Sequence, residues 1–394
     1  MDSMVQNTGK ITTEAWVLYA GEDPRKPTPG QLKKENFTFS DITECEVLGE
    51  PLYGCWEGNM THALERRPVD ICQQRGENKV VIGNAGVVRI LKVGSAVTTV
   101  RPGDTCLVFC NGVWDKFGYP EKILAYDAPN TMGVLAKQMK LHEKQVIVIP
   151  DNTAFSYPQW AGFSLRYITA WANWKLAYGC WRLQMTEEDC PAPFVWGWGG
   201  GVSMAELSLA QFSGCRVAMI SSDDKRLKLI ESMRIKAIDR RLFPDLDFDE
   251  KKYFTDPVYK KAYLESEEIF LDIVKKNTMD LGVSIFIDYV GSPVIRATLR
   301  GLARQGVVTT AGWKEGMKVT TVRAIECIER HMHIHTHYAR YPQGRAAVRF
   351  AEDTGWLPQV DSETYSWDDI PHLAENYAAG KISAYYPIFQ VNKT

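Results

Sequence analysis

A short apolar run leads directly into a cluster of glycines at residues 193–205, which read Pro-Phe-Val-Trp-Gly-Trp-Gly-Gly-Gly-Val-Ser-Met-Ala. Helix-compatible residues follow, so the segment predicts a strand, a tight turn and the start of a helix. Glycines let the backbone approach a pyrophosphate, which binds the N–H groups at a helix N-terminus. A purely structural turn is the alternative. The residues expected to bind a dinucleotide here are Gly197, Gly199, Gly200, Gly201, Val202 and Ser203, with Ser203 where a third glycine is commoner.

The next apolar run, Cys215–Ile220, lies about one strand–helix unit further along the chain. Its carboxyl end should lie beside the adenosine ribose of a bound dinucleotide. NAD enzymes usually carry Asp or Glu there, whereas this chain has Ser221 and Ser222, followed by Lys225 and Arg226. Hydroxyls and cations suit a 2′-phosphate, so we expect NADPH in preference to NADH. The alternative is that both cations are solvated residues of a first helical turn, and two nearby acidic residues favour it.

The length and charge of the chain limit the class of protein. A chain of 394 residues is long enough for two domains. Its formal net charge of −2 argues against a nucleic-acid or membrane-surface partner, since both require a concentrated basic face. No apolar run resembles a signal peptide or a membrane span, and the nine cysteines lack paired spacing, so we expect a cytoplasmic protein with reduced thiols.

Two patterns of secondary structure follow one another along the chain. Short apolar segments bounded by turn residues predict a small β-barrel, with strands at 80–82, 87–93, 105–109 and 145–149. In the middle of the chain strands alternate with helices, which predicts a parallel, doubly wound sheet. The expected strands are 193–196, 215–220, 283–288 and 306–311, and the expected helices are 203–213, 224–233 and 293–304. After His331 we expect the chain to leave the sheet and return to β-type segments.

Five segments resemble the medium-chain dehydrogenase/reductase superfamily in order and spacing: 100–108, 166–171, the glycine turn, 287–291 and 310–313. The resemblance covers nearly the whole chain and implies an α/β fold. A β-rich, GroES-like catalytic domain formed by residues 1–165 and 335–394 should enclose a doubly wound parallel Rossmann domain at 166–334. We expect a helical insertion in that domain at about 240–280, because the stretch is charged, aromatic and longer than an ordinary connection.

Within the superfamily the chain is most similar to the crotonyl-CoA carboxylase/reductase branch. Residues 125–130, Ala-Tyr-Asp-Ala-Pro-Asn, resemble a characteristic stretch of that branch. The 240–280 insertion is similar in place and character. Residues 365–371, Tyr-Ser-Trp-Asp-Asp-Ile-Pro, resemble the C-terminal Phe-Pro-Trp-Asp-Lys-Ile-Pro of the branch.

The zinc ligands of the related alcohol dehydrogenases are not matched. Those enzymes carry Gly-His-Glu where this chain has Gly83, Asn84 and Ala85. Cys55 occupies the place of the first cysteine ligand, but Leu165 stands near the place of the third. A catalytic Zn²⁺ takes three protein ligands, so we expect a zinc-free enzyme.

Four histidines, His331, His333, His335 and His337, recur at a spacing of two and would share one face of a strand. Such a face can bind a metal, which is one interpretation. We prefer the other, in which His337 resembles an active-site histidine of the branch and the remaining three are structural or interfacial.

The resemblance implies hydride transfer from NADPH to the β-carbon of an α,β-unsaturated carbonyl. Thr169, Ala311 and Gly312 should lie near the nicotinamide, and Val290 should also contact the cofactor. Tyr126, Asp127 and His337 should line the reaction pocket, and Cys55 and Glu57 stand where the branch carries asparagines. A buried Glu57 with a raised pKa can protonate an enolate, whereas a solvated loop glutamate is the alternative.

We expect plain reduction in preference to reductive carboxylation, because a carboxylate at position 57 would repel a carboxylating intermediate. The expected substrate is an enoyl thioester of CoA or a carrier protein, although the lysine pairs at 251–252 and 260–261 are weak candidates for a CoA phosphate site. Alternatives are an enone reductase or cyclase of specialised metabolism, a reductive carboxylase and a non-catalytic NADPH-binding protein. A cleft blocked by Trp198 and Trp313 would favour the last. The resemblance also implies a homodimer.

Overall fold

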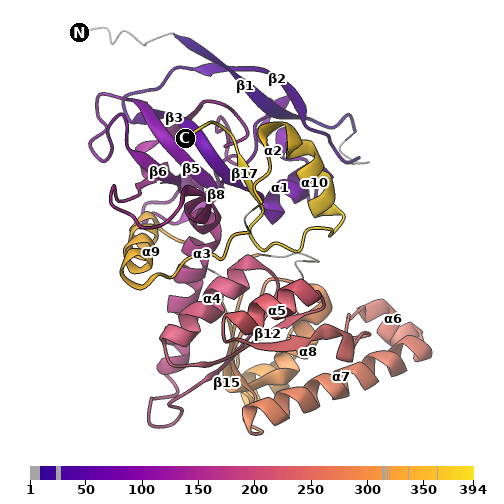
Figure 1. Ribbon diagram of the computed structural model, residues 1–394. Helices are drawn as coiled ribbons and strands as arrows, with labels where there is room; N and C mark the ends of the chain where they lie inside the picture. The colour runs from indigo at the N-terminus through magenta and orange to yellow at the C-terminus, as the bar shows by residue number, and fades with distance from the viewer. Residues whose placement is uncertain are drawn as a thin grey trace. The chain divides into compact units, whose positions relative to one another are not determined.

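The computed structural model describes residues 9–23, 28–312, 316, 318, 320–335, 337–361 and 363–394, so Trp313 lies outside the described residues. The chain divides into two compact units, one formed by Met1–Ile168 with Arg340–Thr394 and the other by Thr169–Ala339 (Figure 1). The long helix α3 (Tyr157–Arg182) begins in the first unit and ends in the second. No described helix has the length and apolarity that a bilayer crossing requires.

The first unit is built from antiparallel strands. Its larger sheet has the order β10-β6-β5-β3-β17, with β9 also paired to β3, and a second sheet has the order β2-β1-β4. The strands predicted at 87–93, 105–109 and 145–149 are confirmed as β5, β6 and β10. The strands are β1 (Lys10–Tyr19), β2 (Lys33–Ser40), β3 (Glu46–Cys55), β4 (Lys79–Val80), β5 (Gly86–Val93), β6 (Thr105–Val108), β7 (Asn111–Trp114), β8 (Pro120–Ile123), β9 (Met139–His142), β10 (Val146–Val148) and β17 (Ile388–Gln390).

Helices occur in the C-terminal part of this unit where only β-type segments were predicted, so that prediction is wrong there. The helices of the unit are α1 (Gly58–Glu65), α2 (Ile71–Arg75), α9 (Tyr341–Thr354) and α10 (Ile370–Ala378), with 3-10 turns at Glu143–Gln145 and Trp367–Asp369. In α9 the buried residues Gly344, Ala347, Val348 and Ala351 recur at helical spacing, and Gly355 ends the helix with a φ of 73°. This helical periodicity of apolar and small residues was the sequence pattern from which the helix could have been predicted.

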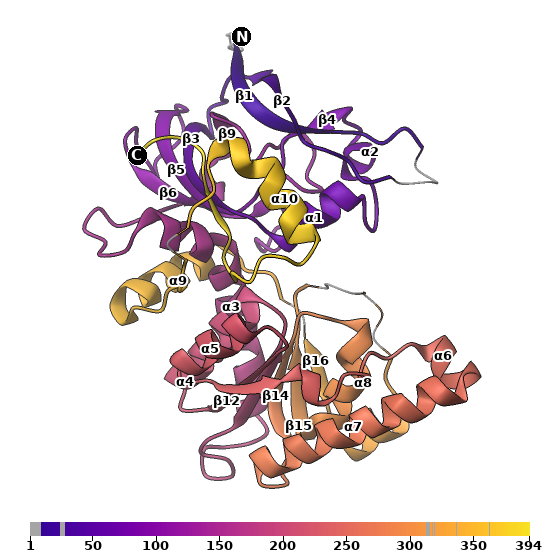
Figure 2. The same cartoon turned by 45° about the vertical axis from the view of Figure 1, so that its right-hand side comes forward.

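The second unit contains a six-stranded parallel sheet with the order β13-β12-β11-β14-β15-β16. Helices α4 and α5 cover one face, and α8 with α7 covers the other (Figure 2). The doubly wound fold is therefore confirmed. Its strands are β11 (Phe194–Trp198), β12 (Arg216–Ser221), β13 (Lys236–Asp239), β14 (Val283–Asp288), β15 (Leu302–Thr309) and β16 (His333–His335). Its helices are α4 (Gly201–Phe212), α5 (Asp224–Ser232), α6 (Glu250–Thr255), α7 (Pro257–Thr278) and α8 (Ser292–Gly301), with a 3-10 turn at Arg240–Leu242 and a π-helical segment at Arg323–Glu329.

Two predicted boundaries in this unit are wrong. The helix expected to reach residue 304 ends at Gly301, and β15 begins at the next residue. The chain also does not leave the sheet after His331, because His333–His335 forms the sixth strand beside β15. His331 itself has a φ of 53° and lies outside the strand, so the four histidines do not share one strand face.

The tryptophan within the glycine turn belongs to the hydrophobic core. Successive residues of β11 face opposite sides of the sheet, so Gly197 faces α4 while Trp198 faces α7 and α8. The Trp198 ring stacks on Phe286, with 5.8 Å between centroids, and its Nε1 donates to Thr298 Oγ1 at 2.8 Å. With 3% of its surface exposed, Trp198 does not block a cleft. This removes one reason for a non-catalytic interpretation.

Candidate active site

The glycine turn joins the end of β11 to the start of α4, at the middle of the parallel sheet. Gly199 has a φ of 112°, and a Cβ there would lie 3.1 Å from Ser203 Oγ and 3.2 Å from Tyr289 Cβ. At Gly197 a Cβ would lie 3.2 Å from Leu207 of α4, so this glycine permits close packing of strand and helix. The Ser203 hydroxyl donates to the Trp198 carbonyl at 2.5 Å, which closes the turn.

The N-terminus of α4 has no side-chain cap. Within the described residues its N-cap, Gly200, supplies no side-chain hydrogen bond, and its first turn holds no acidic residue. The neighbouring helices α5, α6 and α7 are instead capped by the aspartates Asp223, Asp249 and Asp256. The first N–H groups of a helix lack intrahelical acceptors, so the start of α4 can bind a phosphate.

Ser221 is the last residue of β12, the strand beside β11, and Ser222 follows it, so both lie at the strand end where a ribose-binding position was predicted. Two acidic residues nearby are already engaged. Asp223 accepts the N–H of Arg226 at 2.9 Å as the cap of α5, and Asp224 pairs with Arg241 at 2.6 Å. Sequence reasoning missed Arg241, which follows β13 and also pairs with Asp239. These contacts weaken the objection that the acidic residues would repel a 2′-phosphate.

The turn after β14 is held by a buried carboxyl group. Asp288 Oδ1 accepts the N–H groups of Val290 and Gly291, each at 2.9 Å, and Oδ2 accepts the Thr298 hydroxyl at 3.2 Å. Val290, a predicted cofactor contact, is thereby fixed at the carboxyl edge of the sheet. Burial raises the pKa of Asp288 to about 6.

This pKa predicts a pH-dependent stability. In the unfolded state Asp288 loses its proton above about pH 4, whereas in the folded state it keeps the proton up to about pH 6. The stabilisation that the protonated Asp288 gives to the fold is therefore fully present below about pH 4 and is lost as the pH rises through about 6. Asp288→Asn cannot ionise and keeps a carbonyl acceptor. We expect its free energy of unfolding, relative to wild type, to rise by about 2–3 kcal/mol between pH 4 and pH 7 in urea titrations. The exposed Asp280→Asn is the matched control, and equal behaviour of the two variants would contradict the assignment.

A second buried acid lies beneath the glycine turn. Glu206 of α4 is fully buried and its Oε1 accepts the hydroxyl of Tyr289, while Oε2 has no partner in the described part of the chain. Burial raises the pKa of Glu206 well above its usual value and so favours the neutral acid. Tyr289 lies close to both Gly199 and Gly312, so this pair supports two segments of the candidate cofactor site. The sequence analysis did not single out Glu206, although its place on the apolar face of α4 indicated a buried acid.

Asn173 connects Thr169, which was predicted to lie near the nicotinamide, with His337, which was predicted to line the reaction pocket. Its Nδ2 donates to the carbonyl of Thr169 at 3.1 Å and to that of His337 at 2.7 Å. Its Oδ1 accepts the hydroxyl of Thr309, at the end of β15, at 3.4 Å. Ala311 follows two residues after Thr309. The structure therefore brings Thr169 and His337 together through a residue that the sequence did not single out.

Glu57 and Cys55 lie in the first unit, and both are buried. Glu57 Oε2 pairs with Arg166 Nε at 2.8 Å, and Arg166 also donates to the carbonyls of Trp56 and Tyr385. Glu57 is 4% exposed, so the alternative of a solvated loop glutamate is wrong. Burial raises the pKa of Glu57, although Arg166 opposes the shift, and Oε1 has no partner among the described residues.

Asn84 is a further buried polar residue of the first unit. Cys55 N donates to Ala85 O at 3.1 Å, so the segments that carry Cys55 and Asn84 are adjacent. Asn84 is 1% exposed, and neither of its amide atoms has a partner within the described residues. Such an amide can donate to and accept from a bound substrate. Burial also raises the pKa of the Cys55 thiol, which disfavours the thiolate.

Tyr126 and Asp127 lie in a turn after β8, also in the first unit. Asp127 Oδ1 accepts the N–H of Ile123 at 2.6 Å, and the Tyr126 carbonyl accepts Arg75 Nη1 at 3.5 Å. The Tyr126 ring packs against the core of this unit. Tyr126 and Asp127 belong to the first unit and His337 to the second, so each part of the predicted reaction pocket is described within its own unit.

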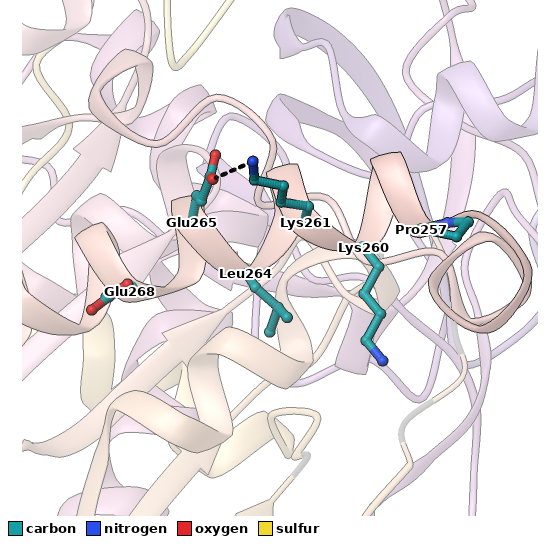
Figure 3. Close-up of a pocket in the computed structure, with 6 residues that line it drawn as sticks. All are labelled: Pro257, Lys260, Lys261, Leu264, Glu265 and Glu268. Atoms are coloured by element: carbon teal, nitrogen blue, oxygen red, sulfur yellow. Dashed lines mark ion pairs between the residues drawn. The ribbon is translucent and has the colours of Figure 1, made fainter.

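The lysines considered for CoA phosphates lie on exposed helix faces. Figure 3 shows a shallow depression along α7 lined by Pro257, Lys260, Lys261, Leu264, Glu265 and Glu268. Lys261 pairs with Glu265 at 3.8 Å, and Lys260 lies over the Tyr253 ring. The depression mixes two cations with two anions, so it does not form a selective phosphate site.

Together these features define a two-unit molecule with a β-rich first unit and a Rossmann sheet whose glycine turn leads into a helix that no described side chain caps. No family model matches the sequence, and no curated protein matches it. Solved structures with a similar fold include the crotonyl-CoA carboxylase/reductase AntE in complex with NADP, at 18% identity and a TM-score of 0.77, covering 97% of this chain and 95% of that one.

Two further structures are similar. The 2-octenoyl-CoA carboxylase reductase CinF, in complex with NADP and 2-octenoyl-CoA, has 15% identity and a TM-score of 0.77, covering 96% of this chain and 87% of that one. The alcohol dehydrogenase of Aeropyrum pernix has 18% identity and a TM-score of 0.72, covering 96% of this chain and 100% of that one. The predicted fold, a β-rich GroES-like unit together with a doubly wound Rossmann unit, is therefore confirmed.

Proposed function

We propose that this protein is a zinc-independent, NADPH-dependent reductase of an α,β-unsaturated carbonyl, with an enoyl thioester of CoA or a carrier protein as substrate. The observation that carries the proposal is the start of α4 behind the glycine turn, which among the described residues has no side-chain cap and no acidic residue in its first turn, together with Ser221 and Ser222 at the end of the next strand. Two similar structures are carboxylase/reductases complexed with NADP, which supports the choice of cofactor.

The residues of the second unit suit a dinucleotide phosphate. A Cβ at Gly199 would fill the space beside Ser203 and Tyr289, so the turn needs glycine to stay open. We assign the pyrophosphate to Gly199, Gly200, Gly201, Val202 and Ser203, and the 2′-phosphate to Ser221, Ser222, Lys225 and Arg226. We assign the nicotinamide side to Thr169, Val290, Ala311 and Gly312. When bound, NADPH supplies a hydride to the substrate.

The residues proposed for the reaction need no metal. A conjugated carbonyl disperses the charge that hydride addition creates, so hydrogen bonds can stabilise the enolate oxygen without a strong Lewis acid. We assign that pocket to Tyr126, Asp127 and His337. In its protonated form Glu57 can donate a proton from Oε1, which has no partner among the described residues, while Arg166 fixes the other oxygen. Cys55 lies beside Glu57 as a buried neutral thiol.

Specificity for NADPH gives a direct prediction. In Ser222→Asp a carboxylate would repel the 2′-phosphate and accept the 2′-hydroxyl of NADH. We expect the Kd for NADPH to rise about 30-fold, equivalent to about 2 kcal/mol, while the Kd for NADH falls. Fluorescence titration measures both, and Ser222→Asn controls for side-chain shape without the charge. An unchanged ratio of the two affinities would refute the assignment of Ser222.

Turnover distinguishes the proposed reaction from its alternatives. NADPH oxidation should be followed with crotonyl-CoA, a longer enoyl-CoA, a simple enone and a ketone, each with and without bicarbonate. We expect oxidation with an enoyl-CoA at a rate independent of bicarbonate, because the Glu57 carboxyl disfavours a carboxylating intermediate. A bicarbonate-dependent rate with a carboxylated product would establish the reductive carboxylase instead, and turnover of the ketone alone would contradict both.

The oligomeric state is a separate proposal. The resemblance implies a homodimer in which the edges of two Rossmann sheets join. In the described sheet β16 is one terminal strand of the order, so its outer edge is a candidate interface. Sedimentation velocity should give twice the mass of one chain, and a monomer at micromolar concentration would contradict the proposal.

A further inference from the structure

We propose that Cys180, His333 and His335 form a binding site for one zinc-type divalent ion in the second unit, apart from the candidate active site. In the described part of the chain these residues are the only group of three His, Cys, Asp or Glu whose ligand atoms all lie within 4.8 Å of one another. The site would be structural and does not involve Cys55 or Asn84. It is therefore independent of the proposed reductase function.

The fold brings these residues together from distant parts of the sequence. Cys180 lies in the last turn of α3, while His333 and His335 lie on β16. Residues two apart on a strand share a face, and the two imidazole rings are parallel within 3°, with centroids 6.2 Å apart. Sequence spacing suggested four histidines on one face, whereas the structure offers two histidines and a cysteine.

Gln184 supports two members of the group. Its Oε1 lies 3.2 Å from Nε2 of His333, and its Nε2 donates to the Cys180 carbonyl at 3.3 Å. An amide oxygen only accepts, so Nε2 of His333 carries the proton and Nδ1 of the neutral ring keeps a lone pair. Histidine ligands of metals usually donate their second N–H to such an acceptor, which fixes the tautomer. Gln184 therefore does for His333 what an outer-shell residue does at a metal site.

His335 supplies a second observation. Its Nε2 is buried and has no hydrogen-bond partner among the residues described. A buried polar nitrogen without a partner costs about 1–3 kcal/mol. A metal ion bound there would remove that cost.

The donor set selects the class of metal. One thiolate and two imidazoles suit Zn²⁺, whereas Mg²⁺ and Ca²⁺ prefer oxygen ligands. Zinc bonds of about 2.0–2.3 Å place tetrahedral ligand atoms about 3.5 Å apart, so separations of up to 4.8 Å need to contract by at most about 1.3 Å. Rotation of three half-buried side chains can supply this contraction. The ion would join the C-terminal end of α3 to the edge strand that precedes His337, and its fourth position would hold water.

Cobalt is a spectroscopic probe for this site. The full chain, freed of metal by dialysis against a chelator, should bind one equivalent of Co²⁺ with a thiolate-to-cobalt charge-transfer band and the intense visible absorption of tetrahedral coordination. Zn²⁺ should displace the cobalt stoichiometrically. We expect Cys180→Ser to abolish the charge-transfer band, and His335→Ala and Gln184→Ala to weaken binding at least about tenfold.

Matched variants keep the test decisive. Cys190→Ser alters another half-buried thiol of the same unit and should retain the band, as should His372→Ala in the first unit. Near-ultraviolet circular dichroism of the metal-free variants establishes that they are folded, and Zn²⁺ should raise the Tm of wild type but not of Cys180→Ser. The proposal is wrong if wild type shows no thiolate band at one equivalent of Co²⁺, or if folded Cys180→Ser keeps the same band.

Discussion

Replacing Gly199 by alanine should weaken NADPH binding about 100-fold, or about 2.7 kcal/mol, the equivalent of losing about one charge-assisted hydrogen bond. Gly199 has a φ of 112°, a region that costs a non-glycine residue about 1–3 kcal/mol. The new Cβ would also lie 3.1 Å from Ser203 Oγ and 3.2 Å from Tyr289 Cβ. The turn would have to move, and the N–H groups of α4 would no longer face the pyrophosphate. Isothermal titration with NADPH measures the effect.

Gly214 offers a matched control for this substitution. It also has a positive φ, 74°, but a Cβ there would meet no atom within 4 Å. Gly214→Ala should therefore lose stability through backbone strain and keep its affinity for NADPH. If Gly199→Ala binds NADPH as tightly as Gly214→Ala does, the glycine turn does not bind the cofactor.

Replacing Arg166 by methionine should lower the free energy of unfolding by about 3–5 kcal/mol, as expected when one partner of a buried ion pair is removed. Glu57 would remain buried without its partner, and the carbonyls of Trp56 and Tyr385 would lose Arg166 as a donor. The loss of stability should grow as the pH rises. Without Arg166, burial raises the pKa of Glu57 further, so at high pH the carboxyl group must either ionise inside the protein or stay protonated, and both cost free energy. Urea unfolding at several pH values measures both effects.

The double variant Glu57→Gln with Arg166→Met separates the ion pair from the packing. It removes the unpaired charge, so we expect it to be more stable than Arg166→Met alone at pH 8. A single variant that costs less than about 1 kcal/mol would mean that the pair contributes little, as exposed pairs do. Arg166 would then not position Glu57.

The Rossmann sheet could be predicted because its signals are local. The apolar run, the glycines and the following helix at 193–205 each depend on neighbouring residues, and the structure has β11, the turn and α4 in that order. The boundary between α8 and β15 could not be predicted as well, since buried leucines, Leu299 and Leu302, lie on both sides of Gly301, where the helix ends and the strand begins. Periodicity alone does not separate a buried helix from a buried strand.

The partners of buried polar residues could not be predicted, because they come from distant parts of the chain. Asn173 bonds to Thr309 and His337, 136 and 164 residues away, and Glu206 bonds to Tyr289, 83 residues away. The burial of Glu57 likewise depends on Arg166, which is 109 residues further on. In each case the residue type was visible in the sequence, whereas its pairing was set by tertiary packing.

The unusual Trp198 illustrates the same limit. Its position between glycines suggested an obstruction of the cofactor cleft, because sequence spacing does not reveal which face of β11 a side chain takes. In the structure it packs against Phe286 and bonds to Thr298 on the face opposite α4. The glycines alone face the helix start.

Isotope transfer tests the central claim most directly. The protein should be incubated with an enoyl-CoA and NADPH carrying deuterium at the transferring position of C4, and the product should be examined by NMR and mass spectrometry. Deuterium at the β-carbon of a saturated thioester, with a solvent-derived proton at the α-carbon, is the result that we predict. Deuterium on a carbonyl carbon, or NADPH that binds without any transfer of label to the enoyl-CoA, would contradict the account.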